Sequence, residues 1–146
     1  MVYAGEHLLP GQIGHFFVLL SLVASLVAAF AYYKTVRSQN TGERKGWLKL
    51  ARLSFFTDCF SVFTIFFMLV YMMFNHMFEY KYVWQHSSLS LEPKYILSAI
   101  WEGQEGSTLL WTIWHCVLGL IFIAREKKWE APVMSVVSFA SSFWPR

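Results

Sequence analysis

Helical spacing aligns several polar side chains within an apolar segment in the last third of the chain. Steps of three, four, three and four residues stay on one face of a helix. Starting from Glu105, these steps reach Thr108, Thr112, His115 and Gly119. The remaining positions are mostly Leu, Trp, Ile and Val. A polar or small face on such a helix is expected to point into the protein rather than toward lipid.

His115 lies near the middle of this apolar segment. A neutral imidazole at membrane depth could ligate haem iron, relay protons, or form a hydrogen bond to a neighbouring helix. The sequence leaves the three roles open, and the plain hydrogen bond is the simplest of them.

Glu102 and Glu105 are three residues apart, which places them on adjoining positions if the segment is helical. Two close carboxylates can serve acid–base chemistry. They can equally stabilise a helix N-terminus, where the dipole end is positive. Both interpretations stay open, and no catalytic residue is assigned.

Four further histidines lie in or near the segments between apolar runs: His7, His15, His76 and His86. Such a group suggests a haem or metal site, although chance clustering in short loops explains any one of them as well. Neither an HExxH nor a CxxCH spacing occurs. We therefore predict no metal site from the histidine spacing.

The composition indicates where these side chains are held. Hydrophobic residues make up 56% and charged residues 14% of the 146 residues, against about 45–50% and about 25% in soluble domains. Cys59 and Cys116 lie in apolar runs and are predicted to be small buried side chains, without a disulfide or a metal. The net charge of +3 comes with no nucleic-acid-binding motif, so nucleic acid is not an expected partner.

Three apolar runs are long enough to be membrane-spanning helices. They cover residues 13–33, 53–75 and 107–124. A fourth run opens at Ala131 and is too short for a full crossing, so the chain looks truncated or the run ends as a short helix near Trp144. The prediction is an all-α, polytopic helical membrane protein with three full transmembrane helices plus a partial fourth, forming a single membrane domain over residues 1–146.

Two features inside the runs concern packing and charge. Ser21, Ser25 and Ala29 recur every fourth residue and predict close packing by another helix. Asp58 is a carboxylate at membrane depth, which is a functional hypothesis by default. Its alternative interpretation is pairing with the nearby Arg52 or with headgroup water.

Positive charge is concentrated in two predicted loops, residues 34–52 and residues 125–128. The positive-inside rule puts both in the cytoplasm and the N-terminus outside. The aromatic-rich residues 76–97 are then expected to lie on the outer membrane surface. No Lys or Arg precedes the first run, so a cleavable signal peptide is not expected.

Three segments resemble those of one membrane protein family. Residues 101–111, WEGQEGSTLLW, resemble the W-G-G-H/Q-E-G-S-x-L-L-W signature of CcmF-type haem lyases of bacterial cytochrome c maturation. Residues 82–87, YVWQHS, resemble that family's Y-V-x-x-H-S, and residues 14–16, GHF, resemble the G-H-F that opens its first helix. Glu102 stands where Gly is usual, and Gln104 stands where His is frequent, which removes one possible imidazole.

The resemblance implies the N-terminal portion of a larger haem lyase in the bacterial inner membrane, within the CcmF–CcsA haem-handling superfamily. Such lyases receive haem from a periplasmic carrier and attach it to the CxxCH thiols of apocytochrome c. The implied cofactor of the complete protein is haem. The implied partners are the haem carrier, the apocytochrome c chaperone and membrane lipid.

On the same resemblance, Trp101, Glu105 and Gly106 form the outer edge of the haem site. Trp101 would pack near the porphyrin, and Glu105 would orient a partner group. The family's tryptophan-rich haem-binding loop and haem-ligating histidines lie further downstream, so no histidine here is assigned as a ligand and this portion alone is expected to be inactive. A non-enzymatic small membrane subunit of an assembly complex is the alternative, and a transporter fragment ranks last.

Overall fold

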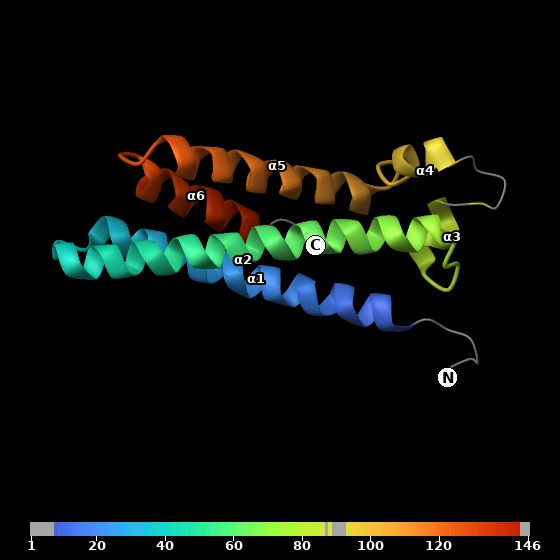
Figure 1. Cartoon of the computed structure of the whole chain (residues 1–146), viewed down its shortest axis with the longest axis horizontal. Helices are drawn as coiled ribbons and strands as arrows, with labels where there is room; N and C mark the ends of the chain where they lie inside the picture. The colour runs from blue at the N-terminus through green and yellow to red at the C-terminus, as the bar shows by residue number, and fades with distance from the viewer. Residues whose placement is uncertain (1–7, 87, 89–92, 144–146) are drawn as a thin grey trace.

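The computed structural model describes residues 8–86, 88 and 93–143 (Figure 1). In this part of the chain the helices are α1 (Leu8–Arg37), α2 (Thr41–Phe74), α3 (Lys81–His86), α4 (Pro93–Ala99), α5 (Gln104–Arg125) and α6 (Glu130–Phe143). Of the described residues, 86% are helical and none lies in a strand. The all-α prediction is therefore confirmed. His7 and the residues from Trp144 onward lie outside the described part.

Three of the helices are long and apolar enough to cross a membrane: α1, α2 and α5. Their most apolar windows have mean hydropathies of 2.3, 2.0 and 1.8. The 14 residues of α6 span about 21 Å, which is less than the roughly 30 Å of a bilayer core. The chain is thus an all-α membrane protein with three helices long and apolar enough for full spans, as predicted, and the described part of α6 is shorter than a span.

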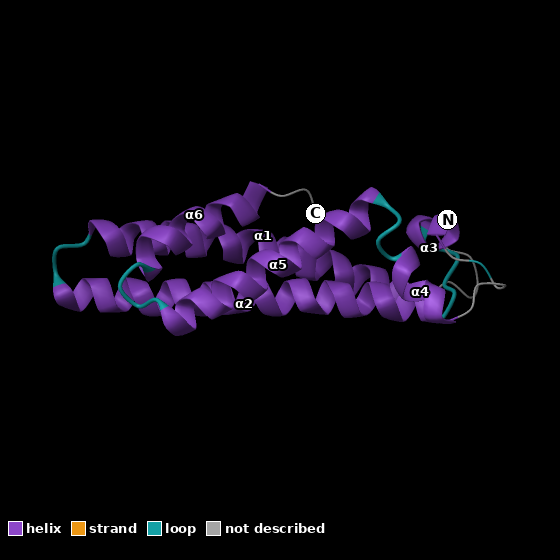
Figure 2. Cartoon of the chain, turned by 90° about the horizontal axis from the view of Figure 1, so that it is seen from above, coloured by secondary structure: helices purple, strands orange, loops and turns teal. Residues whose placement is uncertain are grey.

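α1 and α2 run antiparallel and lie side by side, joined by a short turn at residues 38–40 (Figures 1 and 2). The prediction of a loop over residues 34–52 is wrong for most of that range, because α1 continues to Arg37 and α2 already begins at Thr41. The side chain of Asn40 caps α2 by accepting a hydrogen bond from the Gly42 N–H at 3.1 Å. Good helix formers follow, so α2 reaches about 51 Å over its 34 residues and extends beyond a bilayer core.

The two ends of the bundle differ in what they contain. The turn end holds the turns at residues 38–40 and 126–129, and the motif end holds α3 and α4 (Figure 1). At the motif end, buried Val83, Ile96 and Ile100 pack with Met73 of α2. Within the segment expected to follow the membrane surface, the described residues include two short helices that cover this end of the spans.

Small side chains let α1 approach its neighbours closely. Ser21, Ser25 and Ala29 are all buried, and α1 packs against α2 and α6. Larger side chains of α1, such as Leu19 and Phe30, are exposed on its other faces. The predicted packing seam thus serves helix contacts within this chain.

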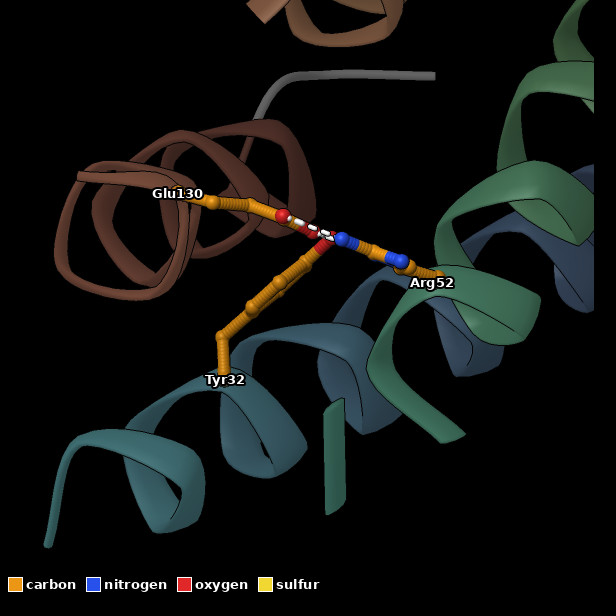
Figure 3. Close-up of polar contacts among 3 residues, drawn as sticks. All are labelled: Tyr32, Arg52 and Glu130. Atoms are coloured by element: carbon orange, nitrogen blue, oxygen red, sulfur yellow. Dashed lines mark hydrogen bonds and ion pairs between the residues drawn. The ribbon is translucent and has the colours of Figure 1, made fainter. Parts of the chain in front are cut away.

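At the turn end, the first residue of α6 is anchored to both α1 and α2 (Figure 3). Nε and Nη2 of Arg52 donate to the two carboxylate oxygens of Glu130 at 2.7 and 2.6 Å. The Tyr32 hydroxyl donates to the same carboxylate at 3.5 Å. The Glu130 side chain is 2% exposed and that of Arg52 is 37% exposed, so a buried carboxylate is neutralised by a cation that reaches the surface.

Asp58 has a different partner from the one considered in the sequence. Arg52 pairs with Glu130, whereas Asp58 accepts a hydrogen bond from Oγ of Ser21 at 2.5 Å. Asp58 is 1% exposed. This bond ties α2 to α1 inside the bundle, and a carboxylate acceptor makes it stronger than a hydrogen bond between neutral groups.

Glu130→Gln should lower the stability of the detergent-solubilised protein, because it removes the charge that neutralises Arg52 and breaks the bidentate pair. The expected loss is near the lower end of about 3–5 kcal/mol for a broken buried pair, since Arg52 is partly exposed. Thermal unfolding followed by helical circular dichroism measures it. Glu126→Gln, at an exposed acid in the adjacent turn, is the matched control, and equal losses in the two variants would contradict this role for Glu130.

Candidate functional site

The segment Trp101–Ser107 consists of a tight turn at residues 101–103 and the first residues of α5. Gly103 is the N-cap residue of α5, with extended backbone angles of φ −84° and ψ 159°. The Ser107 N–H donates to the Gly103 carbonyl at 3.1 Å. The Ser107 hydroxyl donates to the carbonyl of Trp101 at 3.2 Å. These bonds satisfy groups at the start of α5 and fix the direction in which the chain enters it.

Tyr82 of α3 lies directly against this turn. Its hydroxyl donates to the Ile100 carbonyl at 2.5 Å. A Cβ at Gly106 would collide with that same carbonyl and would lie 2.6 Å from the Tyr82 hydroxyl oxygen. Only glycine at position 106 allows the contact between α3, the turn and the start of α5.

His86 of α3 also packs against a glycine near the start of α5. Its ring stacks on that of Tyr82, with centroids 4.4 Å apart, and its Nδ1–H donates to the Tyr82 carbonyl at 3.0 Å. In the neutral ring this leaves Nε2 as the acceptor nitrogen. A Cβ at Gly103 would lie 2.9 Å from Nε2 and 3.0 Å from Cε2 of Tyr82, so a larger residue here would displace these two rings.

Two of the segments noted in the sequence therefore pack as one body, which we call the motif unit: residues 82–86 and 100–107. The third segment begins at Gly14, in the part of α1 nearest to this unit. Just before it, the Gly11 N–H donates to the hydroxyl of Tyr80 at 2.9 Å. Residues 69 positions apart in the sequence thus meet at the motif end.

The environment of Tyr82 keeps its phenol protonated. Burial raises the pKa of Tyr82 above its usual value, and the negative charge of Glu105 raises it further. The hydroxyl therefore remains a donor to the Ile100 carbonyl across the physiological pH range.

Two hollows adjoin the motif unit. The motif-end pocket, of about 510 Å³, lies between α3 and α4 and is lined by Gln85, His86, Tyr95 and Glu102 among others. The interhelical cavity, also of about 510 Å³, lies among α1, α2, α3 and α5. Both volumes fall within the range of about 300–1,000 Å³ typical of small-molecule sites.

The three residues expected at a haem edge lie at different places in this arrangement. Trp101 is 38% exposed, and the residue that follows it, Glu102, lines the motif-end pocket. Glu105 lines the interhelical cavity instead. Gly106 is the close-packing position against Tyr82. Glu102 and Glu105 thus border different hollows, an arrangement that does not direct them to one substrate as an acid–base pair.

The polar face predicted on α5 points inward along much of its length. Thr108 and Thr112 line the interhelical cavity, and Gly119 is buried where a Cβ would collide with the ring of Phe55. His115 is half-buried, and its Nδ1–H donates to the carbonyl of Trp111 at 2.8 Å. A hydrogen bond of His115 to the backbone of its own helix is therefore present.

Metal-ligating side chains are dispersed. Among the residues that the structure describes, no three His, Cys, Asp or Glu side chains gather as a metal site would require. His86 lines the motif-end pocket, whereas His15 is exposed on α1. Cys59 and Cys116 are buried free thiols within the apolar core, as predicted.

Comparison of the chain with models of known protein families, with curated proteins and with solved structures gave no match.

Gly106→Ala should displace Tyr82 and open the motif unit, because the new methyl group has no space between the Ile100 carbonyl and the Tyr82 hydroxyl. Hydrogen–deuterium exchange of residues 96–107 should rise at least about tenfold, the ratio that about 1.4 kcal/mol of lost protection gives. Gly46→Ala is the control, since a Cβ there meets nothing within 4 Å and alanine favours the helix. Unchanged exchange at residues 96–107 in Gly106→Ala would contradict the contact.

Proposed function

We propose that this chain is the N-terminal part of a CcmF-type haem lyase of the bacterial inner membrane, and that the motif unit borders its haem-handling site. One observation carries the proposal. Two of the three segments that resemble the family's signatures pack against each other, and the contacts of Gly103 and Gly106 with Tyr82 and His86 give a physical reason for those residue types.

The distribution of charge supports an orientation for the proposal. Lys and Arg side chains gather at the turn end: Lys34, Arg37, Arg44, Lys45, Arg125, Lys127 and Lys128. By the positive-inside rule this end is cytoplasmic. The motif unit and the N-terminus then lie on the periplasmic side, where haem and apocytochrome c meet in such systems.

The motif-end pocket suits the edge of a porphyrin rather than a complete haem site. His86 offers an imidazole whose tautomer is fixed by its hydrogen bond to the Tyr82 carbonyl, and the half-exposed ring of Tyr95 offers a flat surface. Glu102 adds a negative charge that disfavours haem propionates there. Among the described residues His86 is the one imidazole that lines the pocket, so the iron ligands are expected elsewhere in the complete protein.

Within this proposal each residue has a defined task. Bound haem supplies the vinyl groups to which the cysteine thiols of apocytochrome c add. Trp101 packs against the edge of the ring, and Gly106 acts indirectly by letting Tyr82 hold the turn. Glu105 lines the interhelical cavity and not the motif-end pocket, so it is not part of this edge. None of these residues is proposed as a catalytic group.

The alternative of a non-enzymatic membrane subunit has less support. Its main argument is the seam of small residues on the first helix, which could dock another protein. Ser21, Ser25 and Ala29 are instead buried by helices of this chain. The seam therefore offers no open surface to a partner.

Inactivation of the gene in its source cells tests the proposal. Covalently bound haem on c-type cytochromes, detected by peroxidase staining after denaturing electrophoresis, should be lost, while apocytochrome c is still made. Non-covalent b-type haem in the same membranes is the control and should persist, because haem synthesis is intact. Normal covalent haem on c-type cytochromes in the inactivated strain would contradict the proposal.

A further inference from the structure

The interhelical cavity has an apolar interior at membrane depth. Apolar side chains of three spans line it: Val18 of α1, Val62, Ile65, Met68 and Leu69 of α2, and Leu109 of α5. Water gains few hydrogen bonds in such a space. An empty space of this size would also deprive its walls of dispersion contacts. Within a bilayer, an apolar ligand is therefore expected to fill it.

The described part of α6 does not fill this space. α6 runs antiparallel to α1 (Figures 1 and 2), and its first residue, Glu130, lies beside Tyr32. Ser141 follows Glu130 by eleven residues, and Ser21 precedes Tyr32 by eleven residues. Because the two helices are antiparallel, Ser141 lies at the same height in the bundle as Ser21. Ser21 lines the floor of the cavity. Above that level the cavity is bounded by α1, α2, α3 and α5 alone among the described residues.

The mouth of the cavity is polar and carries both signs of charge. Lys81 and Gln85 of α3 lie on one side, and Gln104 and Glu105 of α5 lie on the other. Lys81 can bind a phosphate, and Glu105 can bind an ammonium group. A cation and a carboxylate at the rim of an apolar cavity match a zwitterionic headgroup above a hydrocarbon chain.

We propose that the interhelical cavity binds one acyl chain of a phospholipid whose headgroup carries both a phosphate and an ammonium group, such as phosphatidylethanolamine. The chain lies between α1, α2 and α5, with its end near Ser21 and Thr112. The phosphate lies at Lys81 and the ammonium group at Glu105. The lipid thereby holds the motif-end half of α5 at a fixed distance from α1 and α2.

The chemistry of the lining favours lipid over haem in this cavity. Among the described residues neither a histidine nor a cysteine lines it, so imidazole and thiolate ligands for iron are missing. The carboxylate of Glu105 at the mouth would repel the propionates of a porphyrin. The methionines Met68 and Met72 adapt readily to a flexible chain.

Photo-crosslinking tests the site in the protein as purified from its membranes and reconstituted into phosphatidylethanolamine vesicles. The probe is phosphatidylethanolamine with a diazirine near the end of one acyl chain, and labelled peptides are mapped by mass spectrometry. Label is expected in the cavity residues 18–21, 62–69 and 109–112. Leu109→Trp, which fills the cavity, should reduce that label about tenfold, whereas Leu118→Trp, at a side chain that is 60% exposed, should not.

Headgroup preference gives a second readout that does not depend on Leu109. Lys81→Ala should weaken retention of phosphatidylethanolamine relative to phosphatidylglycerol in native mass spectra about threefold, as for a partly exposed ion pair. Lys94→Ala on α4 is the control and should change nothing. Cavity label that is absent, or that is equal in Leu109→Trp and the parent, would overturn the proposal. So would a tetrapyrrole or a polypeptide segment found in the cavity, and none of these results bears on whether cytochromes c receive haem.

Discussion

The close approach of Tyr82 to the turn before α5 is the contact on which the motif end depends. The hydroxyl of Tyr82 reaches the Ile100 carbonyl only because position 106 has no side chain. This contact places α3 across the start of α5. α3 then contributes Gln85 to both hollows, so one hydrogen bond and one glycine shape the motif-end pocket and the interhelical cavity together.

The opposite end of the bundle relies on electrostatics rather than on close packing. Glu130 is almost fully buried, and the pairing with Arg52 and Tyr32 joins α6 to the α1–α2 pair. Between the two ends, small residues on α1 and the bond from Ser21 to Asp58 hold the helices together. The spans are thus fixed at both ends and in the middle, which leaves the space beside α5 at the motif end as the cavity.

The sequence predicted the features that depend on local periodicity and composition. The apolar runs predicted the three spans, and the small residues at every fourth position predicted the packing seam of α1. The helical spacing of polar residues predicted that Thr112 and Gly119 face the interior of the bundle. Contacts between distant segments were not predictable. Arg52 has a nearby acid, Asp58, yet it pairs with Glu130, 78 residues away, because α6 folds back alongside α1. The start of α2 was missed because hydropathy does not register the capping by Asn40.

The candidate site was predicted only in outline. The sequence motif contains Gly103 and Gly106, but it does not show why glycine occupies these positions. The rings of Tyr82 and His86, which lie against these glycines, become apparent only in the folded structure. The four-residue spacing of Tyr82 and His86 is a helical signal that could have placed both on one face of α3. No sequence pattern predicts the motif-end pocket or the interhelical cavity, because the residues that line each of them come from several helices.

Photo-crosslinking at Tyr95 tests most directly whether the motif unit handles haem. Tyr95 lines the motif-end pocket and is 52% exposed, so benzoylphenylalanine can replace it with little disturbance. After irradiation of cells that are maturing cytochromes c, our account predicts a porphyrin adduct on the peptide containing position 95. The same substitution at Phe67, exposed on α2 within the spans, should give none. Adducts absent from position 95, or equal at both positions, would contradict a haem-handling motif unit.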